Sequence, residues 1–437
     1  MKRWFVNVRR VMEPRAFESE HRRGLRIMLL EGIPANIVGS LLGGPLQTAF
    51  LLYLGFTSAQ IGVVLAIPSF TLLVQLVVAF AMQKWRNRRF FVVLFAVSHR
   101  TLWVATGLIP LLFPHAAWVP LYIVLFLLSF TSAQICGIIW TSLMADAVPP
   151  AVRGKYFGIR NTVHFAVVCT TLLAGGQIME WLPGGAGFTV LFVISAASVV
   201  WNGWELSRYP NPAFQPSENG SSFSMLFRPF ADGTFMSATA FISVFLLAQN
   251  IAVPLFSYAM LNVLKLNYSE VTLITMLQNV VMMVSYYYWG VLNGRYAARK
   301  LLFWTFPLIA GSCFVWLGMA ALPALLVLVA VHILLGVGLG GYNLLVFNFL
   351  IGDSPKSERP MYVAVFSALT GFAGFVGPLV GGWLYKAAAD GPRWIQEYGL
   401  TAVSGAAMLA LALGVGPFVF RARKPKKTTI DRGVTAR

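Results

Sequence analysis

The amino-acid sequence predicts an all-α integral membrane protein with twelve transmembrane helices in two pseudo-symmetric six-helix bundles. Composition is the first reason, because 58% of the 437 residues are hydrophobic and only 11% are charged, far outside the range of soluble domains. The second reason is an internal repeat, in which five residues of the first half recur 206 positions later. The pairs are Pro149 and Pro355, Arg153 and Arg359, Tyr156 and Tyr362, Gly175 and Gly381, and Gly176 and Gly382.

Apolar segments long enough to cross a membrane fill most of the chain, since a spanning helix needs about 20 residues. We expect six spans in each half. The first six are 24–53, 58–82, 89–112, 116–147, 158–180 and 186–207. The second six are 234–262, 269–292, 300–320, 322–348, 360–386 and 396–420.

Polar segments divide the chain into domains. The interval 208–233 contains several prolines and a serine run, which is typical of a linker. The tail 1–23 lacks the apolar core of a secretory signal, so we expect the first helix to stay and direct insertion. The predicted domains are the N-terminal tail 1–23, the N-terminal bundle 24–207, the linker 208–233, the C-terminal bundle 234–420 and the basic tail 421–437.

The basic residues predict the orientation. If the N-terminal tail is cytoplasmic, all but four of the 33 lysines and arginines lie in cytoplasmic segments or tails, as the positive-inside rule requires. An even number of spans then leaves both termini cytoplasmic, and we expect a multi-pass protein of the plasma (cell inner) membrane. The same distribution explains the net charge of +18, so we expect no nucleic-acid partner. The four exceptions are Arg100, Lys265, Lys386 and Arg393.

The sequence gives no sign of catalysis. Its three cysteines, Cys136, Cys169 and Cys313, all fall in predicted helices and are too few for a disulfide or metal framework. It contains no nucleophile with a matched base and no phosphate-binding loop after a strand. We therefore expect no enzyme activity, no cofactor and no metal site.

Two loops resemble those of a known family. The segment 145–158 reads ADAVPPAVRGKYFG, and 290–300 reads GVLNGRYAARK, close to the signature G-x-L-x-D-R-x-G-R-K. With the two six-helix repeats and the linker between them, these loops resemble the major facilitator superfamily over residues 24–420. Gly294 stands where that signature has its aspartate and Ala297 where it has its second glycine.

The resemblance implies a transporter that moves a small molecule by alternating access, with spans one, four, seven and ten around the cargo. In span one, Asn36, Ser40, Gly43 and Gln47 follow a helical period and predict one polar stripe. The alternative is interhelical hydrogen bonding that holds the bundle together. The candidate cargo residues are Asn36, Gln47, Gln134, Thr141, Gln249, Asn250, Gln278, Asn279, His332 and Asn343.

Span ten and the glycines of span eleven carry further patterns. His332, Gly336, Gly340 and Asn343 share one helical stripe in span ten, which predicts a face toward the cavity. The glycine run at 371–382 in span eleven predicts close helix packing at the interface between the halves.

Ionisable residues inside a membrane are functional candidates by default, and we identify three, Glu31, Arg100 and His332. Glu31 lies 16 residues from Gln47, about 160° around an ideal helix, and so faces away from the polar stripe. An ion pair between Glu31 and Arg100 would make both tolerable, and a structural role is favoured over ion coupling. His332 is a candidate for proton coupling because it lies on a cavity stripe.

Charged residues of the cytoplasmic loops are candidates for gating. Asp146 lies near Arg153 at a helix end and could face the basic loop 84–89, while the alternative is ordinary helix capping. The loops at Arg153 and Arg359 would close the inside. The gating candidates are Asp146, Arg153, Arg295 and Arg359.

These patterns favour a secondary active or facilitative transporter of a small, mostly neutral organic solute, sugar-like or amphipathic. A strongly charged cargo would need several cavity lysines or arginines. One alternative is multidrug efflux, which the 15 methionines and 34 phenylalanines suit. Another is a non-transporting membrane sensor or lipid-handling protein. We expect a small-molecule substrate, the lipid bilayer and protons as a candidate coupling ion to be the partners of a monomer.

Overall fold

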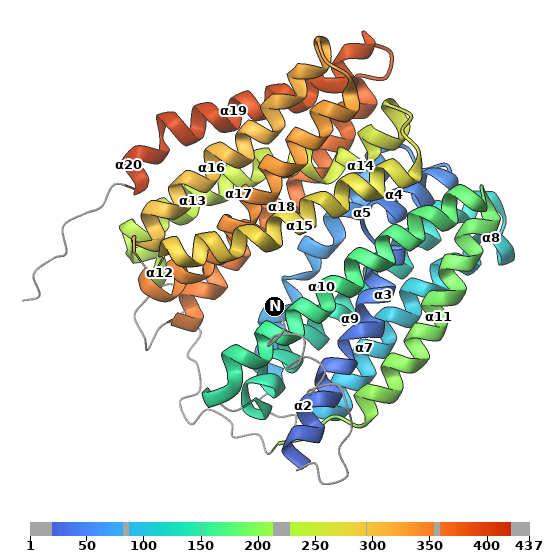
Figure 1. Ribbon diagram of the computed structural model, residues 1–437, viewed down its shortest axis with the longest axis vertical. Coiled ribbons are helices and arrows are strands. Elements are labelled where there is room, and N and C mark those ends of the chain that lie inside the picture. The colour runs from blue at the N-terminus through green and yellow to red at the C-terminus, as the bar shows by residue number, and fades with distance from the viewer. Residues whose placement is uncertain are drawn as a thin grey trace, which may run out of the picture.

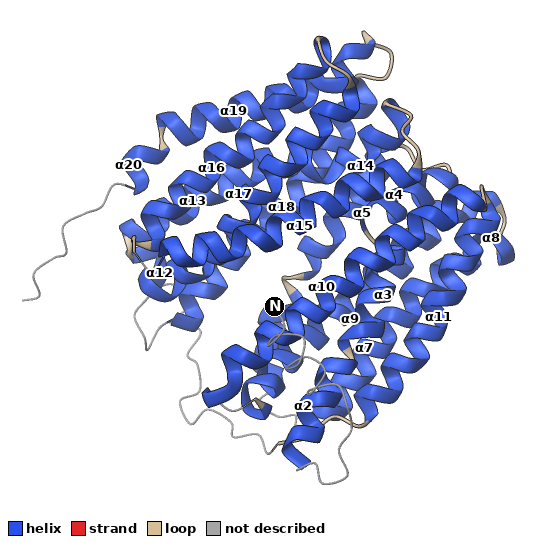
Figure 2. Ribbon diagram, in the orientation of Figure 1, coloured by secondary structure: helices blue, strands red, loops and turns tan. Residues whose placement is uncertain are grey.

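The computed structural model describes residues 20–81, 87–148, 150–212, 228–293, 295–353 and 359–420. These residues form helices and their connections, without a strand among them (Figure 2). They build two helical bundles, one from each half of the chain (Figure 1).

The N-terminal bundle begins with a helical span that is interrupted once. α2 and α3 are separated only by Glu31, whose backbone stays helical at φ −53° and ψ −39°, and α4 follows after a break at Gly43. The helices are α2 (Glu20–Leu30), α3 (Gly32–Leu42), α4 (Gly44–Tyr53), α5 (Ser58–Thr71), α6 (Val74–Ala81), α7 (Arg88–Ala105), η2 (Thr106–Leu108), α8 (Ile109–Leu112), η3 (His115–Ala117), α9 (Trp118–Ala147), α10 (Pro150–Trp181) and α11 (Gly185–Ser207).

The C-terminal bundle repeats the arrangement. Its helix α13 is capped by Asp232, whose Oδ1 accepts hydrogen bonds from the amides of Thr234 and Phe235 at 3.0 and 3.1 Å. The helices are α12 (Arg228–Ala231), α13 (Gly233–Ala252), η5 (Val253–Leu255), α14 (Phe256–Tyr258), η6 (Ala259–Val263), α15 (Tyr268–Asn293), α16 (Ala298–Phe314), η7 (Val315–Ala320), α17 (Ala324–Asp353), α18 (Arg359–Ala387), η8 (Ile395–Gly399), α19 (Leu400–Gly414) and α20 (Gly416–Phe420).

Ten helical segments of the described chain are long and apolar enough to cross a membrane, and they coincide with ten of the predicted spans. The span predicted at 58–82 is divided between α5 and α6, three residues after Pro68, a residue that weakens a helix by removing a backbone donor. The span predicted at 269–292 is one continuous helix, α15, made less apolar by its amides and tyrosines.

The two bundles meet along α5 and α18, and along α10 and α15. Gly62 and Gly382 let the first pair approach so closely that a Cβ on Gly382 would lie 2.5 Å from the Ser58 carbonyl oxygen. The rings of Phe70 and Phe375 pack 5.2 Å apart in the same seam. The close packing predicted for the glycines of α18 is therefore confirmed.

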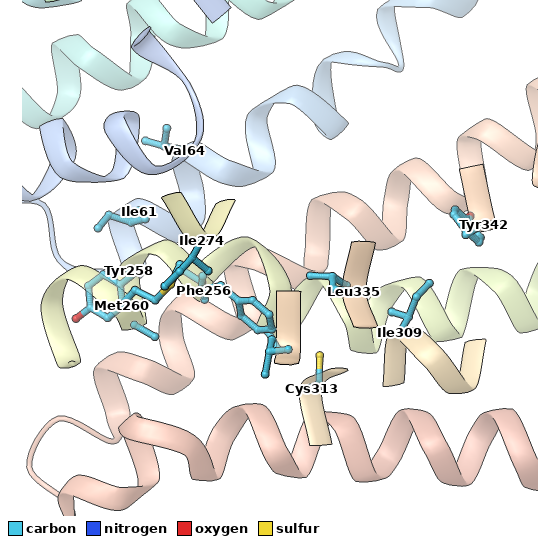
Figure 3. Close-up of a cluster of buried hydrophobic side chains, with 14 of the residues drawn as sticks. Ile61, Val64, Phe256, Tyr258, Met260, Ile274, Ile309, Cys313, Leu335 and Tyr342 are labelled. Carbon is cyan, nitrogen blue, oxygen red and sulfur yellow. The ribbon is translucent and has the colours of Figure 1, made fainter. Parts of the chain in front are cut away.

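Buried apolar side chains form two cores. The larger core joins both bundles, and Figure 3 shows part of it, with Ile61 and Val64 of α5 in the same cluster as Phe256 and Ile274. The smaller core contains residues of the N-terminal bundle alone, from Ile27 to Tyr209. This core lies at the end of the molecule where α7 begins with Arg88 and Arg89 and where Arg208 follows α11, which we call the basic end. Toward the basic end the bundles diverge (Figure 1).

Candidate functional site

A cavity of about 320 Å³ lies within the N-terminal bundle, between α3, α7, α9, α10 and α11. Its lining combines charged and polar side chains with an apolar wall of alanines, Val92, Cys136 and Leu206. Cavities of this mixed kind are typical of small-molecule sites. The polar and aromatic lining residues are Glu31, Asn36, His99, Arg100, Trp140 and Arg160.

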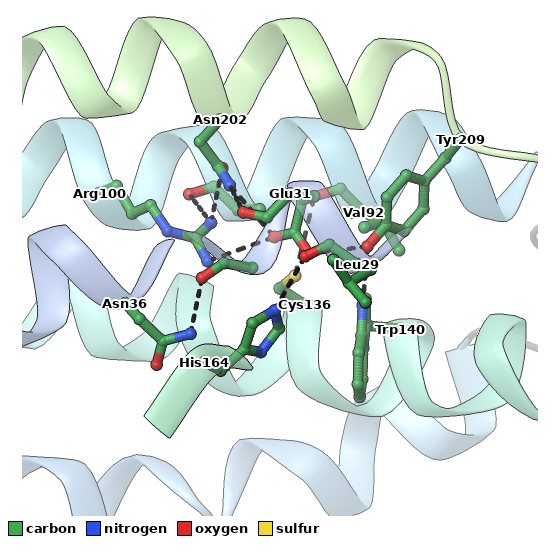
Figure 4. Close-up of polar contacts among 12 residues, drawn as sticks. Leu29, Glu31, Asn36, Val92, Arg100, Cys136, Trp140, His164, Asn202 and Tyr209 are labelled. Carbon is green, nitrogen blue, oxygen red and sulfur yellow. Dashed lines mark hydrogen bonds and ion pairs between the residues drawn. The ribbon is translucent and has the colours of Figure 1, made fainter. Parts of the chain in front are cut away.

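Glu31 enters this cavity from the junction between α2 and α3, and the residue is only 4% exposed. Both carboxylate oxygens accept hydrogen bonds, Oε1 from Asn202 Nδ2 at 3.1 Å and Oε2 from the Tyr209 hydroxyl at 2.7 Å (Figure 4). The Glu31 backbone carbonyl also accepts from Asn202 Nδ2, at 3.0 Å. Glu31 of the first span is therefore tied to the end of α11 through both its backbone and its side chain.

Arg100 of α7 neutralises this carboxylate. Its Nη2 lies 3.8 Å from Glu31 Oε1, and its Nη1 donates to Asn202 Oδ1 at 3.0 Å and to the Ala96 carbonyl at 3.2 Å. The amide of Asn202 thus contacts both members of the pair, which helps to offset the cost of burying two charges. The structure brings together the two residues for which the sequence predicted pairing, and adds Asn202 as their common partner.

Tyr209 joins Glu31 to the aromatic wall of the cavity, because its hydroxyl also accepts a hydrogen bond from Trp140 Nε1 at 3.4 Å. It follows α11 in the chain and is 1% exposed. Burial, and then the Glu31 carboxylate, raise the pKa of the Tyr209 hydroxyl well above its usual value of 10.0. Tyr209 therefore remains a protonated donor to Glu31 at neutral pH.

Arg160 of α10 is a cavity residue that the sequence analysis did not select, because its position near the start of a predicted span resembles that of a loop charge. Its guanidinium lies over the ring of Trp140, 5.0 Å from the centroid. Its Nε is buried, and no hydrogen-bond partner for it exists in the described part of the chain. Arg160 is therefore a cavity cation whose main observed contact is the face of an indole.

Two histidines were also missed, although a complete survey of ionisable residues in the predicted spans would have found them. His99 Nδ1 lies 2.8 Å from Ser129 Oγ, which connects α7 to α9. His164 Nε2 lies 2.9 Å from the Leu29 carbonyl, and its ring packs on Gly32, where a Cβ would overlap it. Both residues hold neighbouring helices around the cavity.

The candidate stripe on the first span does not form one face. Asn36 lines the cavity, with Nδ2 donating to the Gly32 carbonyl at 2.6 Å. Gln47 instead donates to the Tyr122 hydroxyl at 3.2 Å, deep in the bundle. The expectation of one stripe is wrong because the helix is interrupted at Gly43, where the backbone is extended, and Gly44 follows with φ +55°. The helical period does not continue through that break.

The candidates on α9 make contacts within the bundle. Gln134 accepts a hydrogen bond from Gln75 Nε2 at 2.7 Å and donates to the Pro68 carbonyl at 3.2 Å, where α5 ends. Thr141 Oγ1 donates to the carbonyl of Gly137 in its own helix, at 2.8 Å.

The stripe predicted on α17 is a helix-packing face rather than a cavity face, which corrects the expectation from the sequence. Gly336 and Gly340 lie against Val281 and Ser285 of α15. His332 is 2% exposed, with Nδ1 2.8 Å from the carbonyl of residue 328 and its ring 6.0 Å from that of Phe256. These residues contribute to packing within the C-terminal bundle.

The remaining candidates of the second half are spread over three helices. Asn343 is exposed on α17, and its Nδ2 lies 3.3 Å from the Tyr286 hydroxyl. Gln249 is buried on α13, and its Oε1 has no hydrogen-bond partner in the described part of the chain. Asn250 donates to the carbonyl of residue 246 at 2.7 Å and faces α18. Gln278 and Asn279 are half-buried on α15.

The gating candidates do not form a bridge between the bundles in the described structure. Asp146 pairs with Arg88, with Oδ2 and Nη1 2.7 Å apart, so this ion pair connects α9 to α7 inside one bundle. Arg295 is exposed. The side chains of Arg153 and Arg359 lie outside the described residues.

Comparison with known proteins relates the second half of the chain to one family. A model of the Major Facilitator Superfamily matches residues 238–435. No curated protein matches the chain.

Solved structures of transporters share the fold of this chain. The crystal structure of the nucleoside transporter NupG is 12% identical and has a TM-score of 0.69, with 93% of this chain and 100% of NupG covered. A bacterial homologue of the human lysosomal transporter Spinster, in an inward-facing and unoccupied conformation, is 14% identical with a TM-score of 0.70, covering 93% of this chain and 97% of its own. A D-xylose-proton symporter is 12% identical with a TM-score of 0.65, covering 89% and 96%. The chain thus has the fold of these membrane transporters, and its second half matches the superfamily model.

Proposed function

We propose that the chain is a secondary transporter that moves a small amphipathic organic solute by alternating access, with the cavity of the N-terminal bundle as its binding site. The cavity itself is the observation that carries the proposal. It joins a buried ion pair and the indole of Trp140 to a wall of small apolar side chains. Of the two solute classes that the sequence favoured, the amphipathic class suits such a lining better than the sugar-like class.

The proposed orientation puts the basic end in the cytoplasm, in agreement with the positive-inside rule. The larger core joins the bundles, whereas the core at the basic end belongs to one bundle only. In this orientation the two halves are apart on the cytoplasmic side and packed together on the outer side. Alternating access would then separate α5 from α18 and bring the basic ends together.

Protons are the coupling ion that we propose, with Glu31 as the carrier. Glu31 is the one carboxylate in the cavity lining, and it contacts α7 and α11 through Arg100 and Asn202. Protonation would remove the charge that holds Arg100 and would loosen the first span from α7. His332 is a weaker candidate because it packs within the other bundle.

Uptake by the purified protein in liposomes tests this function. A panel of sugars, naphthalene dyes and aromatic acids would be offered with and without an imposed proton gradient. We expect movement of an amphipathic compound that Asn36→Ala reduces and that loses its gradient dependence in Glu31→Gln. The matched control is Glu205→Gln, since Glu205 is an equally buried carboxylate paired with Arg208 outside the cavity.

The possible results separate the alternatives. Transport that is indifferent to the gradient in the wild-type protein would leave a facilitator without Glu31 coupling. Active removal of many unrelated dyes would indicate multidrug efflux. Failure to move any compound would contradict the proposal and favour a sensor or lipid-handling role.

A further inference from the structure

The charges of the cavity do not balance. Three ionised side chains line it, Glu31, Arg100 and Arg160. Glu31 and Arg100 compensate one another, and both carboxylate oxygens and the Arg100 Nη1 have hydrogen-bond partners. Arg160 remains as a positive charge in excess.

The surroundings of Arg160 leave its donors available. Its Cζ lies over the Trp140 ring, 5.0 Å from the ring centroid, and an indole has no acceptor atom for the N–H groups of the guanidinium. Nε is buried without an acceptor in the described part of the chain. A buried N–H group without an acceptor is costly, so an anion that accepts from Nε would remove this cost as well as pair with the charge.

We propose that Arg160 binds the anionic group of the cargo, a carboxylate or a phosphate ester, while Trp140 and the alanine wall receive the apolar body. The planar fork of arginine matches both anions through two parallel hydrogen bonds. The volume of about 320 Å³ is at the lower end of the range for ligand pockets, so the cargo is a small organic anion. This inference rests on the proposed transport function and replaces the mostly neutral solute expected from the sequence.

Binding of matched naphthalene compounds to the purified full chain tests the inference. The probes are 2-naphthoate, 1-naphthyl phosphate and the uncharged 2-naphthamide, measured by equilibrium dialysis. We expect both anions to bind the wild-type protein at least about tenfold more tightly than the amide. Arg160→Gln should abolish that preference, and Arg160→Lys should retain only part of it, because lysine keeps the charge and loses the fork.

Arg208 provides a matched control, since its guanidinium also lies over a tryptophan, Trp204, at 5.9 Å, but it pairs with Glu205 and does not line the cavity. Arg208→Gln should leave the anion preference unchanged. If Arg160→Gln does not fold, the comparison of the three probes on the wild-type protein still tests whether the cavity prefers an anion. Three results would overturn the inference. They are equal binding of the anions and the amide, an anion preference that survives in Arg160→Gln, and no binding of either anion.

Two further arms identify the source of the anion and separate this inference from the transport proposal. The first arm measures whether phosphatidylglycerol displaces 2-naphthoate from the protein in nanodiscs that otherwise contain phosphatidylcholine. Displacement would indicate that the natural anion at Arg160 is a lipid headgroup. No displacement would indicate that it is a soluble solute. In the liposome assay, transport of neutral compounds alone would contradict the Arg160 site and leave transport intact. Binding of anions without movement of any compound would support the site and contradict transport.

Discussion

The hydroxyl of Tyr209 donates a 2.7 Å hydrogen bond to Oε2 of Glu31, linking a residue that lies shortly after α11 to the junction of α2 and α3 in the first span. Tyr209 is 178 positions away from Glu31 in the chain. The contact connects the start of the linker between the bundles directly to the cavity. A shift of the linker is therefore coupled to the carboxylate that we propose as the proton carrier.

Substitution Tyr209→Phe tests this link. It removes the donor from a buried carboxylate oxygen, and we expect a loss of about 1–3 kcal/mol in the free energy of unfolding. Thermal unfolding in detergent measures the change. Tyr287→Phe is the control, because that tyrosine is 71% exposed, and an equal effect of both substitutions would contradict the role of the hydrogen bond.

Alkaline pH should expose the same contact. The pKa of Tyr209 is raised well above 10.0 in the folded state, while a tyrosine in the unfolded chain titrates near about 10. The stabilisation by the neutral phenol is fully present below that pH and is lost as the pH rises above it, since only the unfolded state then ionises. The melting temperature should fall less steeply above pH 10 in Tyr209→Phe than in the wild-type protein, and parallel curves would refute this.

The ion pair between Arg88 and Asp146 should stabilise one bundle. Arg88 is fully buried, whereas the Asp146 side chain is 47% exposed, so we expect Asp146→Asn to cost about 1–3 kcal/mol, less than a fully buried pair would. Guanidinium unfolding monitored by tryptophan fluorescence gives the value. The exposed pair Arg393–Glu397 has the same 2.7 Å separation, and Glu397→Gln should cost less than about 1 kcal/mol. Similar losses in the two variants would argue against a buried role for Arg88.

The seam between α5 and α18 requires glycine at position 382. A Cβ there would approach the backbone of residues 58–62, so Gly382→Ala should push the helices apart, destabilise the protein by about 1–3 kcal/mol and slow transport. Gly39→Ala is the control, because nothing lies within 4 Å of a Cβ at that position. A disulfide cross-link between cysteines placed on α5 and α18 would report the separation. Unchanged cross-linking in Gly382→Ala would show that the seam tolerates a methyl group.

The sequence predicted the fold well because lipid imposes a strong and local constraint. Each long apolar run must form a helix that satisfies its own backbone, so helix positions follow from composition alone. The pairing of Glu31 with Arg100 was a hypothesis from the sequence, because two opposite charges inside the membrane become tolerable when they pair, and the structure places them 3.8 Å apart.

Site details depended on features that periodicity cannot show. The interruption at Gly43 means that residues before and after it do not follow one helical period. Asn36 therefore lines the cavity, whereas Gln47 donates to Tyr122 inside the bundle. Arg160 belongs to the cavity only because α10 packs beside Trp140 of α9, and Asn202 becomes the partner of Glu31 across 171 positions. Such contacts follow from tertiary packing.

The separation of the two apolar cores has a consequence for how such a protein can diversify. The cavity lies among side chains of the N-terminal bundle, near the smaller core, while the joint between the bundles is made by the larger core and the glycines of α5 and α18. In the proposed mechanism, cargo recognition and mechanical coupling therefore draw on different sets of residues. Under that mechanism, substitutions around the cavity would change the cargo while the joint keeps its geometry, so one moving scaffold could be inherited by descendants with different substrates.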